Sequence, residues 1–196
     1  MKYIKYLAIL VCICCLAFKS VSISSKENFV TDSTVVKKIF LLRHAKSSHE
    51  NSKLIDFDRP LNDEGKQDAG EMGDYIARSG EQIELIVASP SVRTRETAAI
   101  ICKKINYDLK LVKWDSTIYA CTAEALLNCI KKTDKKYKSV LYIGHNNSMT
   151  HVVNMIQKDI VIADMPTCGL VGIRFRESEW NDSLSGRIMF YKTPKQ

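Results

Sequence analysis

Residues 35–47 read VVKKIFLLRHAKS and combine an apolar run with an abrupt change of chemistry. The run at 35–42 is typical of a buried β-strand, because it is short, apolar and rich in β-branched residues. Arg43, His44 and Lys46 follow it directly. In an open α/β sheet, ligands bind beyond the carboxyl ends of the parallel strands. The stretch therefore predicts a first strand that leads into a functional site.

The rest of the chain alternates strand patterns with helix patterns. Apolar residues recur at helical spacing, as in Ala69, Met72 and Ile76, and short apolar runs separate the helical segments. We predict strands at 35–42, 85–88, 109–112, 139–143, 169–175 and 187–191, and helices at 65–79, 93–105, 122–132 and 148–156. The last two strands are expected to form a hairpin, with 177–185 as its loop. This alternation predicts an α/β fold, a three-layer αβα sandwich with a mostly parallel central sheet, over residues 34–194.

Length and composition limit the class of protein. The chain has 196 residues, of which 45% are hydrophobic and 26% charged, as expected for one globular domain. These values exclude a disordered chain and a disulfide-dense mini-protein. The net charge of +7 fits an anionic substrate or an acidic partner. Because the basic residues are spread along the chain, we expect no nucleic-acid partner.

Residues 1–25 differ from the rest of the chain. Lys2 and Lys5 precede an uncharged run at 6–18, YLAILVCICCLAF, and small polar residues follow it. This layout is typical of a signal peptide, and the run is short for a membrane span, which needs about 20 residues. We predict an exported or membrane-anchored protein of the cell envelope, with a cytoplasmic location as the alternative. Membrane contact is expected only through this segment, whether it is cleaved, lipidated at a cysteine or retained.

The four cysteines outside this segment form no C-x-x-C pair, so a zinc ribbon or a thioredoxin-type motif has no support. They are Cys102, Cys121, Cys129 and Cys168. We interpret them as small buried apolar residues and leave any pairing open. No cluster of metal-ligating carboxylates is apparent either, and we expect no metal and no cofactor.

Three predicted strand ends carry histidine or arginine. Besides Arg43 and His44, the strand at 85–88 leads to Arg93, and the strand at 139–143 leads to His145. A guanidinium matches phosphate oxygens with two parallel donors, and an imidazole can act as a nucleophile through one ring nitrogen. No G-x-x-x-x-G-K motif is present, so a P-loop nucleotide site is not supported. The pattern predicts a site for a phosphoryl group.

Four motifs in order resemble the histidine phosphatase superfamily, the phosphoglycerate-mutase-like group. Residues 43–45 (RHA) resemble its R-H-G/A signature, 89–98 (SPSVRTRETA) its S-P-x-x-R-x-x-x-T-A segment, and 144–146 (GHN) its second-histidine motif. Residues 56–65 (DFDRPLNDEG) look most like the short SixA-type phosphohistidine phosphatases. The resemblance covers nearly all of 36–175 and implies a phosphoglycerate-mutase-like fold.

The resemblance also implies roles for individual residues. His44 matches the nucleophile that becomes phosphorylated, Arg43 and Arg93 match the arginines that bind phosphate, and His145 matches the second histidine that contacts the phosphoryl group. Water then hydrolyses the phosphoenzyme, and no metal is implied. Phosphoryl transfer needs mainly positioning and charge neutralisation, which these side chains supply.

Three further residues are assigned from their neighbourhood. Ser47 is a possible donor to phosphate, and Arg59 is either a residue at the rim of the substrate site or the partner of an ion pair. Larger members of the superfamily have a glutamate acid in an insertion after the second motif, and this chain shows no clear equivalent. Asp115 is the nearest candidate for the acid, with a turn or helix cap as the alternative.

The missing acid favours a phosphoramidate substrate, because an imidazole can be protonated before it leaves. We therefore expect a phosphatase that acts on a phosphohistidine protein. One alternative is hydrolysis of a small phosphate ester, such as a sugar phosphate, in the cell envelope, and another is a non-catalytic phosphate-binding module. An exported enzyme would not meet cytoplasmic phosphorelay proteins, so the natural substrate stays open.

Overall fold

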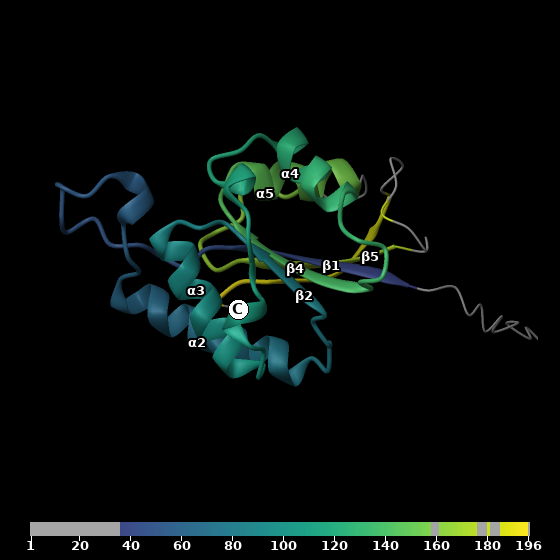
Figure 1. Ribbon diagram of the computed structural model, residues 1–196, viewed down its shortest axis with the longest axis horizontal. Coiled ribbons are helices and arrows are strands. Elements are labelled where there is room, and N and C mark those ends of the chain that lie inside the picture. The colour runs from purple at the N-terminus through teal and green to yellow at the C-terminus, as the bar shows by residue number, and fades with distance from the viewer. Residues whose placement is uncertain (1–35, 158–160, 176–179, 181–184, 196) are drawn as a thin grey trace, which may run out of the picture. The chain divides into compact units, whose positions relative to one another are not determined.

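A single sheet runs through the middle of the part of the chain that the structure describes (Figure 1). The computed structural model describes residues 36–157, 161–175, 180 and 185–195. The six strands are β1 (Lys37–Arg43), β2 (Leu85–Ala88), β3 (Lys113–Trp114), β4 (Ser139–Gly144), β5 (Leu170–Phe175) and β6 (Arg187–Lys192), in the order β3-β2-β4-β1-β5-β6. The first four in this order are parallel, whereas β5 runs antiparallel to both of its neighbours, β1 and β6. The mostly parallel sheet and the terminal antiparallel pair are confirmed.

Helices cover both faces of this sheet, which completes the predicted three layers (Figure 1). On one face lie α2 (Asp63–Arg78) and α3 (Val92–Lys104), and on the other α4 (Ala123–Lys131) and α5 (Ser148–Ile156). Three short 3-10 helices lie in the connections: η1 (Asp56–Asp58), η2 (Leu109–Leu111) and η3 (Ser116–Ile118).

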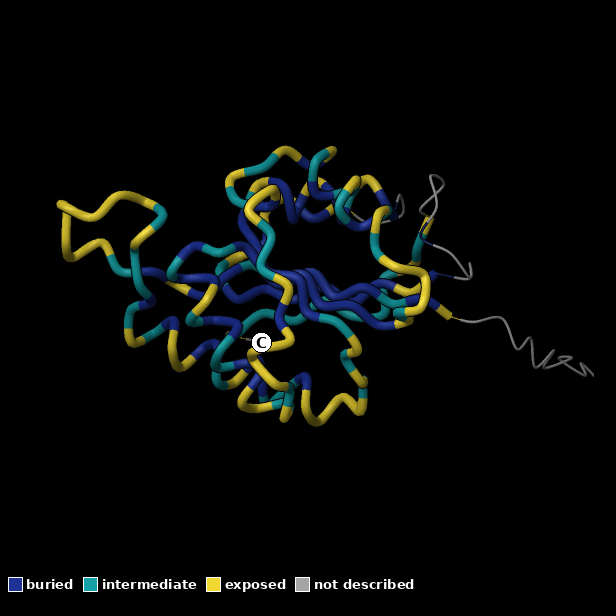
Figure 2. The backbone as a smooth tube through the Cα atoms, in the orientation of Figure 1, coloured by how far each residue is buried: buried dark blue, intermediate teal, exposed yellow. Residues whose placement is uncertain are grey.

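Strand β1 divides the apolar core into two clusters. Ile39 and Leu41 belong to the cluster under α4 and α5, and Phe40 and Leu42 belong to the cluster under α2 and α3. This division follows from the alternation of side chains along a strand. The central strands are therefore buried on both faces, as Figure 2 shows, and polar chemistry is confined to their ends.

The predicted strand at 109–112 is wrong. Leu109–Leu111 forms η2, and the short strand β3 follows at Lys113–Trp114. The carboxylate of Asp108 accepts a hydrogen bond from the Lys110 amide at 2.9 Å, which caps the 3-10 turn. A local side-chain bond of this kind competes with strand pairing.

The N-terminal prediction for residues 1–25 lies outside the described residues, as does most of the 177–185 loop. Where the structure describes the chain, no helix is long and apolar enough to cross a membrane. The four cysteines of this part are free thiols, with Cys102 and Cys168 buried.

The parallel strands end at one edge of the sheet. Arg43 at the end of β1 pairs in register with Gly144 at the end of β4, and Ala88 at the end of β2 pairs with Ile143. The residues that follow these three ends are therefore neighbours in space, although about 50 residues separate each from the next in the chain.

Candidate active site

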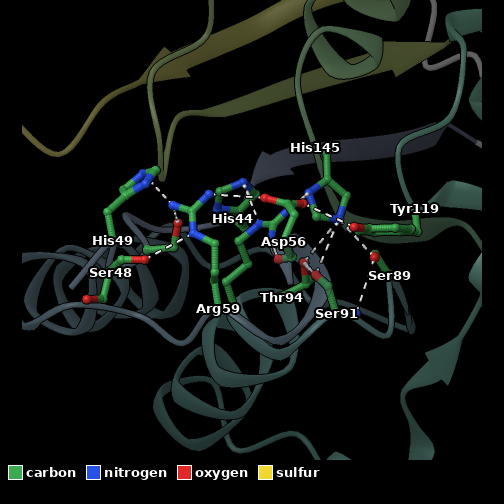
Figure 3. A network of polar contacts seen from close by, with 12 residues as sticks. His44, Ser48, His49, Asp56, Arg59, Ser89, Ser91, Thr94, Tyr119 and His145 are labelled. Carbon is green, nitrogen blue, oxygen red and sulfur yellow. Dashed lines mark hydrogen bonds and ion pairs between the residues drawn. The ribbon is translucent and has the colours of Figure 1, made fainter. Parts of the chain in front are cut away.

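The structure brings His44 and His145 together at this edge (Figure 3), and Arg93 donates to both. The two imidazole centroids lie 5.1 Å apart. Arg93, in the first turn of α3, donates from Nε to His44 Nε2 at 3.2 Å and from Nη2 to His145 Nδ1 at 3.2 Å. Arg43 lines the same cavity as His44 and Arg93. The four residues singled out at the strand ends thus form one cluster.

His44 is held as a neutral ring with a defined tautomer. Its Nδ1 lies 2.8 Å from the carbonyl oxygen of Ala45, which can only accept, so Nδ1 carries the proton. The lone pair is left on Nε2, which faces Arg93. Burial, aided by the charges of Arg93 and Arg43, lowers the pKa of His44 to about 4. A neutral imidazole with its lone pair on Nε2 is the form that a nucleophile needs, and in the resting site this lone pair accepts from Arg93 Nε.

His145 is also fixed through both nitrogens. Its Nδ1 accepts from the Arg93 guanidinium, which has donors only, so Nε2 carries the proton and donates to Ser89 Oγ at 2.9 Å. Burial, followed by the nearby His44 and Arg93, lowers the pKa of His145 to about 3. The ring of Tyr119 packs edge-on against His145 at 5.2 Å.

The S-P-x-x-R-x-x-x-T segment fixes α3 against the end of β1. Thr97 Oγ1 accepts from the Ala45 amide at 3.1 Å and donates to the Arg93 carbonyl at 2.7 Å. Arg95, two positions beyond Arg93, donates to the Pro90 carbonyl and stacks over the Trp114 ring at 4.7 Å. It is not among the cavity-lining residues.

The connection that returns from the site to α2 is equally constrained. The Asn62 side chain caps α2 by accepting from the Gly65 amide at 2.8 Å, and the Asn62 amide donates to the Lys46 carbonyl. A Cβ atom on Gly65 would lie 2.1 Å from that carbonyl oxygen. The glycine thus allows the start of α2 to pack directly on the loop after β1.

Arg43 has one buried donor without a partner. Its Nη1 donates to the Met165 carbonyl at 2.5 Å and lies 3.6 Å from the Asp164 carboxylate, whereas Nε is buried and unbonded among the described residues. Asn146 holds the same segment through bonds from its side-chain amide to Asp164 and Met165. An unpaired buried N–H is costly.

The site opens into a cavity of about 250 Å³. Cationic side chains dominate its lining, and Asp56 is the carboxylate among them; the lining residues are Arg43, His44, Lys46, Ser47, His49, Asp56, Arg59, Arg93 and Thr167. Arginine forks of this kind match a dianionic, tetrahedral phosphoryl group.

Ser47 and Arg59 lie at the cavity, as expected, and contact each other. Arg59 donates from Nη2 to Ser47 Oγ at 2.8 Å, from Nε to the Ser48 carbonyl at 3.0 Å, and from Nη1 to Asp56 at 3.0 Å. It also contacts His49. Arg59 is therefore both a rim residue and an ion-pair partner, the two interpretations that the sequence left open.

The Asp115 carboxylate caps a turn. It accepts from the amide of Thr117 at 2.9 Å and from its hydroxyl at 2.6 Å, and it also contacts the Cys129 thiol. Asp115 does not line the cavity. The geometry thus matches the helix-cap alternative given for this residue.

Sequence reasoning missed Asp56 and Tyr119. The Asp56 carboxylate lies 2.8 Å from Arg93 Nη2. It accepts from the Tyr119 hydroxyl at 3.0 Å (Figure 3). Partial burial acts to raise its pKa, but the bond and charge of Arg93, with Tyr119 and Arg59, lower it. Asp56 opens the 56–65 segment that carries the SixA resemblance, so that segment was a signal; Tyr119 stands in no motif.

No group of three or more potential metal ligands occurs among the residues that the structure describes. The donors at the cavity are mainly cationic, which makes it a poor cation site and a good anion site.

Comparison with known proteins agrees with this geometry. Residues 39–116 match the model of the histidine phosphatase superfamily (branch 1). The chain is also 25% identical to the solved putative phosphohistidine phosphatase SixA from Agrobacterium tumefaciens, with a TM-score of 0.69 over 81% of this chain and 98% of that one. The chain thus resembles the histidine phosphatase superfamily in sequence over residues 39–116 and in its fold.

Two further proteins are similar to this chain, one in fold and one in sequence. A solved protein histidine phosphatase SixA complexed with tungstate is 18% identical, with a TM-score of 0.70 over 81% of this chain and 97% of that one. An uncharacterized chloroplastic protein of Arabidopsis thaliana is 26% identical over 160 residues, 78% of this chain and 72% of that protein. The resemblance and the architecture expected from it are confirmed, and the chain is a hydrolase of the histidine phosphatase type.

Proposed function

We propose that this histidine phosphatase removes the phosphoryl group from a phosphohistidine of a protein, through a covalent intermediate on His44. The observation that carries the proposal is the state of His44. Its ring is neutral, its Nδ1 is occupied by the Ala45 carbonyl, and its Nε2 lies beside Arg93 in a cationic cavity.

In the first step, the lone pair of His44 Nε2 attacks phosphorus while the bond from phosphorus to the substrate nitrogen breaks. The electron pair of that bond goes to the leaving imidazole. Arg93 and Arg43, which line the cavity, neutralise the phosphoryl oxygens, and His145 accepts from Arg93 beside them. Charge neutralisation and alignment supply most of the catalysis in phosphoryl transfer.

In the second step, a water molecule attacks the phosphorylated His44. The new P–O bond forms as the P–Nε2 bond breaks, and the electron pair returns to His44. The proton lost by the water passes to solvent or to the departing phosphate. Because His44 is again neutral, with its proton on Nδ1, the resting state is restored.

The state of Asp56 favours a phosphoramidate over an alcohol ester. Asp56 is the carboxyl group at the cavity, and Arg93, Tyr119 and Arg59 hold it ionised, so the resting site offers no acid to an alkoxide leaving group. An imidazole leaves readily once it is protonated. The tungstate-bound SixA relative supports an anion site in this fold, since tungstate is a tetrahedral oxyanion like phosphate.

His44→Ala tests the proposal. We expect no turnover of a phosphohistidine protein, and the acid-labile radiolabel that wild type takes up from that substrate should be absent. His151→Ala is the matched control, because His151 is exposed on α5 away from the cavity, and it should retain full activity. Full activity of a well-folded His44→Ala protein would disprove the mechanism. Faster turnover of sugar phosphates than of phosphohistidine would instead favour the small-ester alternative.

A further inference from the structure

The loop between β1 and α2 places an anion of its own on Arg93. Asp56 Oδ2 lies 2.8 Å from Arg93 Nη2, and the Asp56 main-chain carbonyl accepts from Arg93 Nη1. A carboxylate is planar and a phosphoryl group is tetrahedral, but both present anionic oxygens that accept hydrogen bonds from the two parallel donors of a guanidinium. Asp56 therefore occupies donors that the substrate needs.

The partners of Arg93 leave little room for a substrate to bind beside them. A guanidinium has five N–H donors. In this structure Arg93 donates from Nε to His44, from Nη1 to the Asp56 carbonyl, and from Nη2 to both Asp56 Oδ2 and His145 Nδ1. Two phosphoryl oxygens can reach the Arg93 fork only if a present partner yields. His44 and His145 are buried, whereas the Asp56 side chain is 56% exposed. His44 Nε2 also has to give up its bond from Arg93 Nε when it attacks phosphorus, but the carboxylate is the anionic partner that phosphate can displace.

We propose that the Asp56 carboxylate is an internal substitute for the phosphoryl group, which holds Arg93 in its catalytic orientation until the substrate displaces it, and that Tyr119 positions Asp56 for this exchange. The inference rests on the proposed function, because it requires a phosphoryl site at Arg93. It adds two positioning residues, Asp56 and Tyr119, to the four residues at the strand ends.

Tyr119 holds the Asp56 carboxylate through its hydroxyl, and packing of its ring against two neighbours holds Tyr119 itself in place. Its hydroxyl donates to Oδ2, the oxygen that also contacts Arg93, and its ring packs edge-on against Phe57 at 5.0 Å and His145 at 5.2 Å. Arg59 holds the other oxygen, Oδ1, at 3.0 Å. After displacement from Arg93, the carboxylate stays bonded to Arg59 and Tyr119 at the edge of the cavity.

The test is the affinity for inorganic phosphate, measured by calorimetry on purified protein. Asp56→Asn keeps the shape of the side chain and removes its charge, so phosphate no longer displaces an anion. We expect about 10-fold tighter binding, the effect of one charge-assisted hydrogen bond. Asp58→Asn is the matched control, because Asp58 is exposed on the same η1 helix and is not a partner of Arg93; its affinity should equal that of wild type.

Tyr119→Phe removes the hydroxyl and keeps the ring packing. We expect about threefold tighter phosphate binding in the wild-type background and no further gain in the Asp56→Asn background, since Tyr119 acts through Asp56. Additive effects of the two substitutions would contradict the positioning role. A residue that only stabilised the fold would not increase affinity at all.

Arg93→Ala separates a failure of this inference from a failure of the proposed function. In one outcome, wild type binds phosphate, Arg93→Ala does not, and Asp56→Asn binds no more tightly than wild type. This outcome would overturn the exchange at Asp56 and leave the phosphate site intact. If wild type shows no binding that depends on Arg93, the phosphoryl site itself is wrong, and the proposed function falls with it.

Discussion

Arg93 donates to both histidines of the site, and its guanidinium is also the partner of Asp56. We predict that Arg93→Ala lowers kcat/KM at least 10- to 100-fold, the equivalent of one charge-assisted hydrogen bond at roughly 1.5–3 kcal/mol. Arg93→Lys should recover part of this loss, because an ammonium keeps the charge but cannot reproduce the fork. Steady-state kinetics on a phosphohistidine protein measure both.

Arg95→Ala is the control for this prediction. Arg95 stacks on Trp114 and donates to the Pro90 carbonyl, so its loss removes a cation from the same helix without opening the cavity. We expect kcat/KM within about twofold of wild type, in the range of surface substitutions. A loss as large as that of Arg93→Ala would show that the charge of α3, rather than the contact of Arg93, governs the rate.

The two buried histidines predict how stability depends on pH. Burial lowers the pKa of His44 to about 4 and that of His145 to about 3, whereas both titrate near 6.5 in the unfolded chain. Below pH 6.5 the unfolded state therefore binds more protons than the folded state, and the free energy of unfolding falls as the pH drops from 6.5 towards 4. The slope is at most about 1.4 kcal/mol per pH unit for each histidine.

Urea unfolding at several pH values between 7.5 and 4.5 measures this slope. His44→Asn should reduce it, because one of the two groups that resist protonation is removed. An identical slope in wild type and His44→Asn would mean that His44 is not held neutral by the fold.

At the scale of elements, the start of α2 depends on one residue without a side chain. Gly65→Ala would place a Cβ atom 2.1 Å from the Lys46 carbonyl oxygen, so either α2 or the loop after β1 must shift. We predict a loss of thermal stability of several degrees, as for overpacked sites that cost about 1–3 kcal/mol, together with lower activity because the loop leads to His44.

Gly70→Ala is the matched control for Gly65→Ala. Gly70 lies in the same helix, and nothing lies within 4 Å of the position of its added Cβ atom. Alanine is the better helix former by about 1 kcal/mol, so this variant should be as stable as wild type or more stable. Thermal unfolding followed by circular dichroism compares the two, and equal destabilisation would contradict the contact described for Gly65.

The elements also show why part of the site was predictable and part was not. Arg43, His44, Arg93 and His145 follow parallel strands, and parallel strands end at one edge, so their meeting follows from topology and motif order. The local competition at Asp108 was overlooked, which is why a strand was predicted where η2 forms. Tyr119 reaches Asp56 across 63 positions of sequence through a connection without a motif, and only the folded chain reveals that contact.

At the scale of the whole molecule, the helices cover the two faces of the sheet and leave the carboxyl edge to loops (Figures 1 and 2). The phosphoryl site is built from the ends of three strands and the loop that carries Asp56. Among the residues that the structure describes, the cavity at this edge is lined by the loops after β1 and before β5, by η1 and by α3, which is consistent with the proposed protein substrate.

The charge of the whole edge leads to a last prediction, on metal dependence. A dianionic phosphoryl group needs positive charge in the transition state, and many phosphoryl-transfer enzymes obtain it from Mg²⁺. Here Arg43 and Arg93 lie at the cavity with Lys46 and Arg59, and a divalent cation among them would be repelled. We therefore expect turnover of a phosphohistidine protein to be unchanged after chelator treatment and dialysis. Loss of activity that Mg²⁺ or Mn²⁺ restores would contradict this expectation and show that carboxylates such as Asp56 bind a metal ion rather than Arg93.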